Sequence, residues 1–147
     1  MRLTRASDYA VRIMVYLARQ PEAARATRGR IIQETGVPAA FLNKLVQKLV
    51  RAGLLLARPG VQGGCALASP AGSIPILRII ESIDGPVLLS DCLEDQAVCP
   101  NAGYCGFRRL LGQLQSEMIR ILSSTTLADM AHQGAISGSP RAGTKLP

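Results

Sequence analysis

The chain has 147 residues, of which 48% are hydrophobic and only 3% aromatic, with no tryptophan. That length supports one domain with a core of Leu, Ile, Val and Ala, plus an extension. No run approaches the ~20 apolar residues of a membrane span, and Arg12 interrupts the early apolar stretch that could suggest a signal peptide. We expect a cytoplasmic protein and no enzyme, because no nucleophile-base set, nucleotide loop or carboxylate dyad is present.

The net charge of +7 is unevenly distributed along the chain. Residues 1–60 contain eleven Lys and Arg against three Asp and Glu, a net of +8, whereas residues 61–147 contain six against seven. A basic half joined to a neutral half indicates a polyanion-binding module that carries a second function. Charge alone leaves a merely solvated basic face as an equal alternative.

Helical periodicity predicts a first helix that Ser7 or Asp8 can cap and that ends before Pro21. A short second helix follows Thr27 and ends before Gly36.

A third helix runs from Pro38 to Gly53, with Phe41, Leu42 and Leu45 expected to be buried. Helix, glycine turn and helix are the spacing of a helix-turn-helix, in which the start of the last helix enters the major groove of DNA. The alternative is an ordinary helical hairpin with a basic surface.

The predicted third helix carries polar residues suited to reading bases. Asn43 can bond adenine twice, and Lys44 can reach guanine or a phosphate. The other basic residues nearby are expected to position the protein on phosphates. The predicted contact residues of this part are Ala39, Ala40, Asn43 and Lys44 for bases, and Arg2, Arg28, Arg30, Lys48 and Arg51 for phosphates.

Two short apolar runs, "LLLAR" and "CALAS", flank the turn-forming "PGVQGG" and predict a β-hairpin, a candidate wing in which Cys65 is a small packing residue. Ser73 can cap a following helix over residues 75–83, and a long amphipathic helix spans residues 107–122. The expected organisation is a DNA-binding domain over 1–70, a linker helix, cysteine loop and long helix over 71–132, and a disordered tail over 133–147.

Three of the four cysteines lie in "SDCLEDQAVCPNAGYCGFRR" at positions 92, 99 and 105. No Cys-x2-Cys pair is present, and the only histidine, His132, is remote, so a local zinc site of the usual spacing is not available. Thiolates also suit iron-sulfur clusters, whose irons normally require four protein ligands. Spacing leaves open a cluster, zinc, a thiol switch or plain buried cysteines.

The segments "MRLTRASDYAVR", "TGVPAAFLNKLVQKLVRAGLL", "GGCALA" and "IIESIDGP", followed by the cysteine loop and a long helix, resemble the Rrf2 family of bacterial regulators over residues 1 to about 130. The resemblance implies a mainly α fold with a small β-hairpin wing, namely a winged helix-turn-helix plus a long dimerisation helix. It also implies a homodimer on double-stranded DNA, in which the wing residues Arg58, Gln62 and Gly63 approach the minor groove.

The resemblance implies that Cys92, Cys99 and Cys105 hold an iron-sulfur cluster. IscR-like members have a histidine at the place of Arg108, so a [2Fe-2S] cluster of that type is less favoured here. NsrR-like members use an aspartate at the place of Asp8, donated by the other subunit, for a [4Fe-4S] cluster that senses nitric oxide. The resemblance thus favours a repressor with NsrR-like ligands that senses nitric oxide, redox state or the supply of iron and clusters. Asp8 can alternatively be a helix cap or a first-turn acid.

Overall fold

A computed structural model describes residues 3–22, 24–60 and 63–133 of the chain. Arg2, Gln62 and residues 134–147 of the predicted tail lie outside the described residues, whereas Gln133 ends a helix. The elements in chain order are α1 (Arg5–Ala18), α2 (Arg28–Thr35), α3 (Ala39–Arg51), β1 (Leu55–Arg58), β2 (Gly64–Leu67), the short 3-10 helix η1 (Ala71–Ser73), α4 (Ile76–Asp84), α5 (Asp91–Glu94), the 3-10 helix η2 (Gln96–Val98), α6 (Gly106–Ser124) and α7 (Leu127–Gln133).

The predicted helix boundaries hold for α2 and shift for α1. Thr27 caps α2 through its side chain, and Gly36 ends it in the left-handed conformation with φ of 67°. The cap of α1 is Thr4 instead of Ser7 or Asp8, because the Thr4 hydroxyl accepts a hydrogen bond from the Ser7 amide at 3.2 Å. Asp8 is therefore an acid of the first turn, one of the two structural roles expected for it.

The hairpin forms as predicted, and it pairs with a further segment. Strands β1 and β2 are antiparallel, with Leu55 opposite Leu67 and Arg58 opposite Gly64. The backbone of Cys65 also exchanges two hydrogen bonds of 2.9 Å with Ala26, in the loop before α2. This bridge attaches the base of the wing to the helix-turn-helix.

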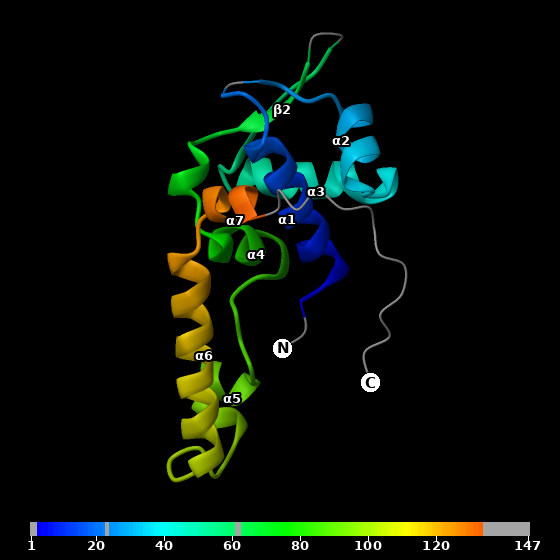
Figure 1. Cartoon of the computed structure of the whole chain (residues 1–147). Helices are drawn as coiled ribbons and strands as arrows, with labels where there is room; N and C mark the ends of the chain where they lie inside the picture. Colours follow the sequence, from blue (N-terminus) through cyan, green and yellow to red (C-terminus); the bar gives the residue numbers. More distant parts are fainter. Residues whose placement is uncertain (1–2, 23, 61–62, 134–147) are drawn as a thin grey trace, which may run out of the picture.

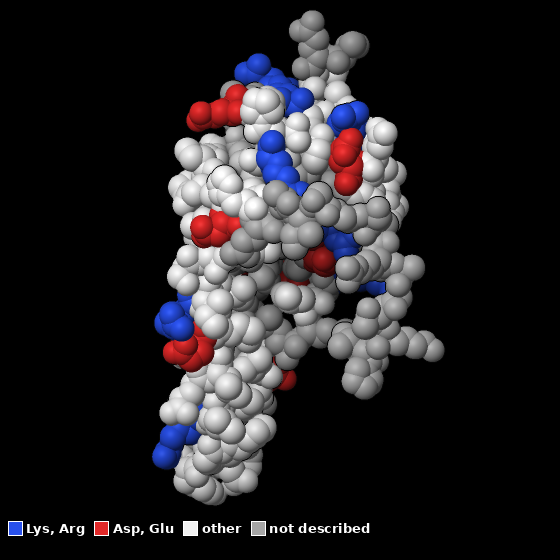
Figure 2. Space-filling model, viewed as in Figure 1, with Lys and Arg blue, Asp and Glu red and all other residues white. Residues whose placement is uncertain are grey.

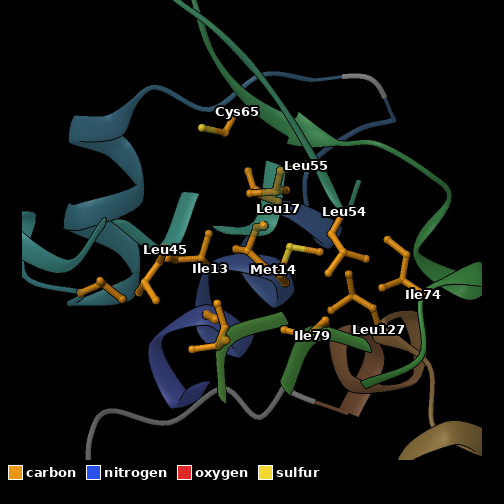
Figure 3. Packing of buried hydrophobic residues seen from close by; sticks show 14 of the residues in the cluster. Ile13, Met14, Leu17, Leu45, Leu54, Leu55, Cys65, Ile74, Ile79 and Leu127 are labelled. Atoms are coloured by element: carbon orange, nitrogen blue, oxygen red, sulfur yellow. The ribbon is translucent and has the colours of Figure 1, made fainter. Parts of the chain in front are cut away.

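We call the part of the chain formed by α1 to α4, the two strands and α7 the head. Its core lies between α1, α3 and α4, and Figure 3 shows Ile13, Met14 and Leu17 of α1 pointing into the centre of this core. Ile79 of α4 and Leu127 of α7 are fully buried in the same cluster. Residues on both sides of position 70 thus share one core. Pro75 precedes α4 as its cap residue, and Ser73 instead belongs to η1.

Helix α6 extends away from the head, and Figure 1 shows α5 and the cysteine loop at its far end. Not one residue of α6 is buried. After Ser124 the chain turns back, and α7 packs against α1. Sequence periodicity did not predict α7 as a separate helix, although Thr126 and Asp129 form a reciprocal capping pair at its start.

Candidate nucleic-acid interface and cysteine loop

Helix α3 presents one polar face because its apolar face is anchored in the core. Leu42, Leu45 and Leu49 are buried. The predicted base-reading residues Ala39, Ala40, Asn43 and Lys44 are all exposed at the start of this helix. The structure therefore leaves this face available to a partner.

The sequence predicts that Phe41 is buried, and this prediction is wrong, because 42% of its surface is exposed. Its ring meets that of Tyr9 edge-on, with centroids 5.4 Å apart and planes at 72°. The Arg12 guanidinium lies 5.9 Å from the Tyr9 ring centre. The first turn of α3 is thus supported by an aromatic residue of α1, which leaves part of the Phe41 ring at the surface.

A groove of 790 Å³ lies between the start of α2, helix α3 and the wing. Four predicted DNA-contact residues line it: Arg28, Asn43, Arg58 and Gly63. Thr27 and Gln47 line it as well, although sequence reasoning did not select them. Gln47 could have been found, because it lies one helical turn after Asn43 on the same face.

The remaining described residues that were predicted to contact phosphates, Arg30, Arg51 and Lys48, differ in what their side chains contact. Arg30 lies 3.3 Å from Glu34 in an exposed ion pair, and Arg51 is exposed in the last turn of α3. The Lys48 amine donates a hydrogen bond of 2.7 Å to the Ile83 carbonyl at the end of α4. In this arrangement Lys48 joins α3 to α4 and does not point freely toward solvent.

Two basic side chains from different elements line the groove, namely Arg28 of α2 and Arg58 of β1. On the face shown in Figure 2, blue side chains are frequent around the wing and α2, with acidic residues among them. The Arg25 guanidinium also reaches the Gly64 carbonyl at 3.5 Å, which ties the loop before α2 to the wing.

Cys65 lies on the inner wall of the groove with 3% of its surface exposed. Burial raises the pKa of its thiol, and the charges of Arg28 and Arg25 oppose this only in part. The thiol is therefore neutral at pH 7 and packs as a small apolar group, as the sequence predicts.

The cysteine loop holds three half-buried thiols at the far end of α6. Cys105 is the cap residue of α6, and its sulfur accepts a hydrogen bond from the Arg108 amide at 3.4 Å. The sulfur of Cys92 lies 3.3 Å from the Ser90 hydroxyl. All four cysteines are free, and no three Cys, His, Asp or Glu side chains of the described residues come together as a metal-binding group.

Asp8 belongs to the first turn of α1. Figure 1 shows α1 in the head and α5 with the cysteine loop at the far end of α6. The Asp8 carboxylate pairs with Arg12 at 2.8 Å, and about half of each side chain is exposed. It also borders an apolar groove of 370 Å³ between α1, α4, α6 and α7, lined by Leu3, Val11, Ile76, Ile80, Leu122 and Met130 among others.

An exposed apolar stripe follows one side of α6. Phe107, Leu110, Leu114 and Ile121 recur at helical spacing and expose 66%, 48%, 52% and 53% of their surfaces. So large an exposed apolar stripe marks an interaction surface, on a helix whose residues Met118, Ile119 and Leu122 pack against the core.

The chain matches the family described as "Rrf2: Iron-dependent Transcriptional regulator" over residues 3–133. This protein belongs to the Rrf2 family. Protein aau3 of Rhizobium meliloti is 32% identical over 138 residues, which cover 88% of this chain and 84% of that protein. Protein rrf2 of Nitratidesulfovibrio vulgaris is 30% identical over 139 residues, which cover 92% and 91%.

Solved structures of Rrf2 regulators have the same fold. CymR, described as the global cysteine regulator of B. subtilis, superposes with a TM-score of 0.76 at 28% identity, covering 90% of this chain and 98% of CymR. IscR of T. potens superposes with a TM-score of 0.72 at 22% identity, covering 90% and 88%. The winged-helix fold and the family resemblance predicted from sequence are thereby confirmed.

The Rrf2 assignment also decides the broad class of function. Rrf2 members and the structural neighbours are DNA-binding transcription regulators and not enzymes, as the sequence predicts. None of the described helices combines the length and apolar character needed to cross a membrane.

Proposed function

We propose that this protein is a homodimeric transcriptional repressor whose DNA affinity is controlled by an iron-sulfur cluster held by Cys92, Cys99 and Cys105. The observation that carries the proposal is a set of three free, half-buried thiols in one loop, at the opposite end of α6 from a DNA-binding head. Because bacterial DNA lies in the cytoplasm, the protein acts there.

The donor set fits an iron-sulfur cluster in its chemistry. Thiolates are the usual ligands of such clusters, and three of them leave one ligand to be supplied. The sulfur of Cys105 faces the start of α6, where the helix dipole favours negative charge. When bound, the cluster would supply reactivity toward nitric oxide or oxygen. Its presence would also depend on the supply of iron.

Asp8 of the partner subunit is the proposed fourth ligand, which favours [4Fe-4S] over [2Fe-2S]. Within one chain Asp8 and the cysteine loop lie apart, so such a ligand has to come from the second copy. Arg108 occupies the place where a local histidine would be expected, and it cannot ligate iron as a cation.

The proposed dimer is formed by the apolar stripe of α6, namely Phe107, Leu110, Leu114 and Ile121. The groove bordered by Asp8 lies beside Leu122 of the same helix and adds apolar surface to the stripe. If the partner's α6 covers both, Asp8 becomes part of the interface, which is where a shared ligand has to lie.

Contacts in the head provide a route from Asp8 to the DNA-reading helix. Asp8 pairs with Arg12, Arg12 lies over Tyr9, and Tyr9 packs against Phe41 in the first turn of α3. A change in the partner of the Asp8 carboxylate would free Arg12 and alter the support of Phe41. The position of Asn43 and Lys44 would then depend on the state of the sensing site.

On DNA, the start of α3 would enter the major groove with Ala39, Ala40, Asn43 and Lys44 at the bases. The groove walls Arg28, Arg58 and Gly63 would approach the sugar-phosphate backbone and minor groove, together with Arg30 and Arg51. Arg2 and Gln62 remain proposed contacts on the grounds of sequence.

A cluster-free regulator that uses zinc or thiol oxidation is the second candidate. One observation favours it: the related CymR of B. subtilis is described as a cysteine regulator. The same three thiols would then respond to oxidants or to zinc without iron.

Metal analysis of protein purified without oxygen separates the two candidates. We expect a brown protein with iron and acid-labile sulfide in similar amounts, and loss of promoter binding when nitric oxide or a chelator is added. Cys92→Ser should abolish the colour, whereas Cys65→Ser, which changes a thiol of the head, should retain it. Colourless wild-type protein that contains zinc would contradict the cluster.

A further inference from the structure

Arg108 contacts both ends of the cysteine loop. Its backbone amide donates a hydrogen bond to the Cys105 sulfur at 3.4 Å, and its side-chain Nε donates one to the Cys92 carbonyl at 2.8 Å. One residue of α6 thus sets the position of two cysteines that are thirteen positions apart in the sequence.

A second polar contact from α6 holds the segment that leads into the loop. The Gln115 side-chain oxygen accepts a hydrogen bond from the Leu89 amide at 2.9 Å. Arg108 and Gln115 are seven residues apart, which is about two helical turns, so both side chains leave the same face of α6.

Between these two polar contacts, α6 makes an apolar contact with α5. Gly112 lies between Arg108 and Gln115, and a Cβ built on it would lie 3.8 Å from the Leu93 side chain. Leu93 belongs to α5, which packs against α6. A Cβ at this position would make an ordinary van der Waals contact, so the close packing of α5 on α6 does not depend on the glycine.

We propose that Arg108 and Gln115 act as a two-point clamp that holds the segment from Leu89 to Cys92 on α6 and so places Cys92 relative to Cys105. Arg108 is the principal positioning residue, because its hydrogen bond is charge-assisted and directed by a planar group. The clamp acts before any metal or oxidant binds, and it bears on the proposed function only because these thiols form the sensing site.

The test uses the full chain, reduced and free of metal, and measures amide hydrogen exchange of residues 89–95. The amides of Leu89, Leu93 and Asp95 are all hydrogen-bonded in this segment. Arg108→Gln should raise their exchange rate about tenfold, as expected from loss of one charge-assisted hydrogen bond, and Arg108→Lys should restore part of the protection.

Arg109→Gln is the matched control, because it removes the same charge from an adjacent, exposed position. It should leave the exchange rates unchanged. Unchanged exchange in Arg108→Gln, or equal acceleration in Arg109→Gln, would overturn the clamp. Should Arg108→Gln fail to fold, Gln115→Leu is decisive, since the clamp requires faster exchange at the Leu89 amide and unchanged exchange refutes it.

A separate arm loads the same variants with iron and sulfide without oxygen. We expect Arg108→Gln to retain its iron for a shorter time in the presence of a chelator than Arg109→Gln does. Wild-type protein that never takes up iron would contradict the cluster and leave the exchange result, and with it the clamp, unaffected. Equal iron retention in both variants would contradict a role of the clamp in holding the loaded site.

Discussion

The hydroxyl of Ser7 lies 2.7 Å from a carboxylate oxygen of Asp84, which joins the start of α1 to the end of α4 across 77 residues of sequence. Thr4 adds a second hydroxyl bond of 2.7 Å to the same carboxylate. Lys48 bonds to the neighbouring Ile83 carbonyl, so α3 meets these helices at the same point. This polar junction connects the cap of α1 to α3, the helix proposed to read DNA.

The junction predicts that stability depends on the protonation of Asp84. Partial burial tends to raise the pKa of this carboxyl, but hydrogen bonds from Thr4 and Ser7 outweigh that effect and hold the pKa below its ordinary value. A group with a lowered folded-state pKa stabilises the fold above its unfolded pKa of about 3.9. This stability is lost as the pH falls through the folded-state pKa.

Asp84→Asn should therefore lower the free energy of unfolding at pH 7 by about 1 kcal/mol, a value reduced by solvent screening of the exposed carboxylate. Its difference from wild type should shrink as the pH falls below 4. Urea titrations between pH 3 and pH 7 measure this. A constant difference over that range would show that the charge of Asp84 is not the cause.

The close approach of Gly64 to the loop before α2 predicts a cost for any side chain there. Gly64 has φ of 141°, and a Cβ would lie 2.6 Å from the Ala26 carbonyl oxygen. Gly64→Ala should lower the free energy of unfolding by about 1–3 kcal/mol and weaken DNA binding by moving the wing. Thermal unfolding measures this. Gly29→Ala, where nothing lies within 4 Å of the added carbon, should be neutral or slightly stabilising.

The two polar residues at the start of α3 should affect DNA binding in different ways. Asn43→Ala should cost about 1–3 kcal/mol on the operator and relax the preference at one base pair. Lys44→Ala should reduce the slope of log affinity against log salt by about 1 if the amine contacts a phosphate. Salt titrations on operator and random DNA distinguish these outcomes. Arg120→Ala, on α6 away from the groove, should change neither quantity.

The α6 stripe predicts a dimer that one charge can disrupt. Leu114 exposes 52% of its surface in the single chain, so Leu114→Glu should leave the fold of the subunit intact. A buried, unpaired carboxylate at the interface should weaken the dimer at least tenfold, by a rough estimate. Sedimentation measures the state of association. Gln113→Glu adds the same charge beside the stripe and should remain dimeric.

If Asp8 ligates the cluster, replacing it should shorten the cluster lifetime, an effect that loss of its ion pair with Arg12 cannot explain. Asp8→Asn should shorten the lifetime of the cluster in a chelator and alter promoter binding. The exposed pair with Arg12 is worth less than about 1 kcal/mol, so thermal stability should barely change. Glu34→Gln breaks the similar exposed pair with Arg30 and serves as the control, with a normal cluster lifetime expected. Equal lifetimes in both variants would leave Asp8 as a first-turn acid only.

Local patterns predicted most of the head correctly. Thr27 and Gly36 bound α2 because a hydroxyl cap and a left-handed glycine act within a few residues of their own positions. Two apolar runs around a glycine-rich turn likewise predict the hairpin of the wing. By contrast, the exposure of Phe41 depends on Tyr9, and the bond of Lys48 depends on Ile83, neither of which is a sequence neighbour.

The sequence by itself determined helices α1 to α4 and α6, the hairpin, the basic half and the grouping of three thiols, since periodicity, caps and composition act over short distances along the chain. Only the tertiary structure decided that α7 returns to the head, that Asp84 binds the start of α1, and that Arg108 joins Cys92 to Cys105. These contacts arise when the apolar faces of separate helices pack together, and packing sets which polar groups meet.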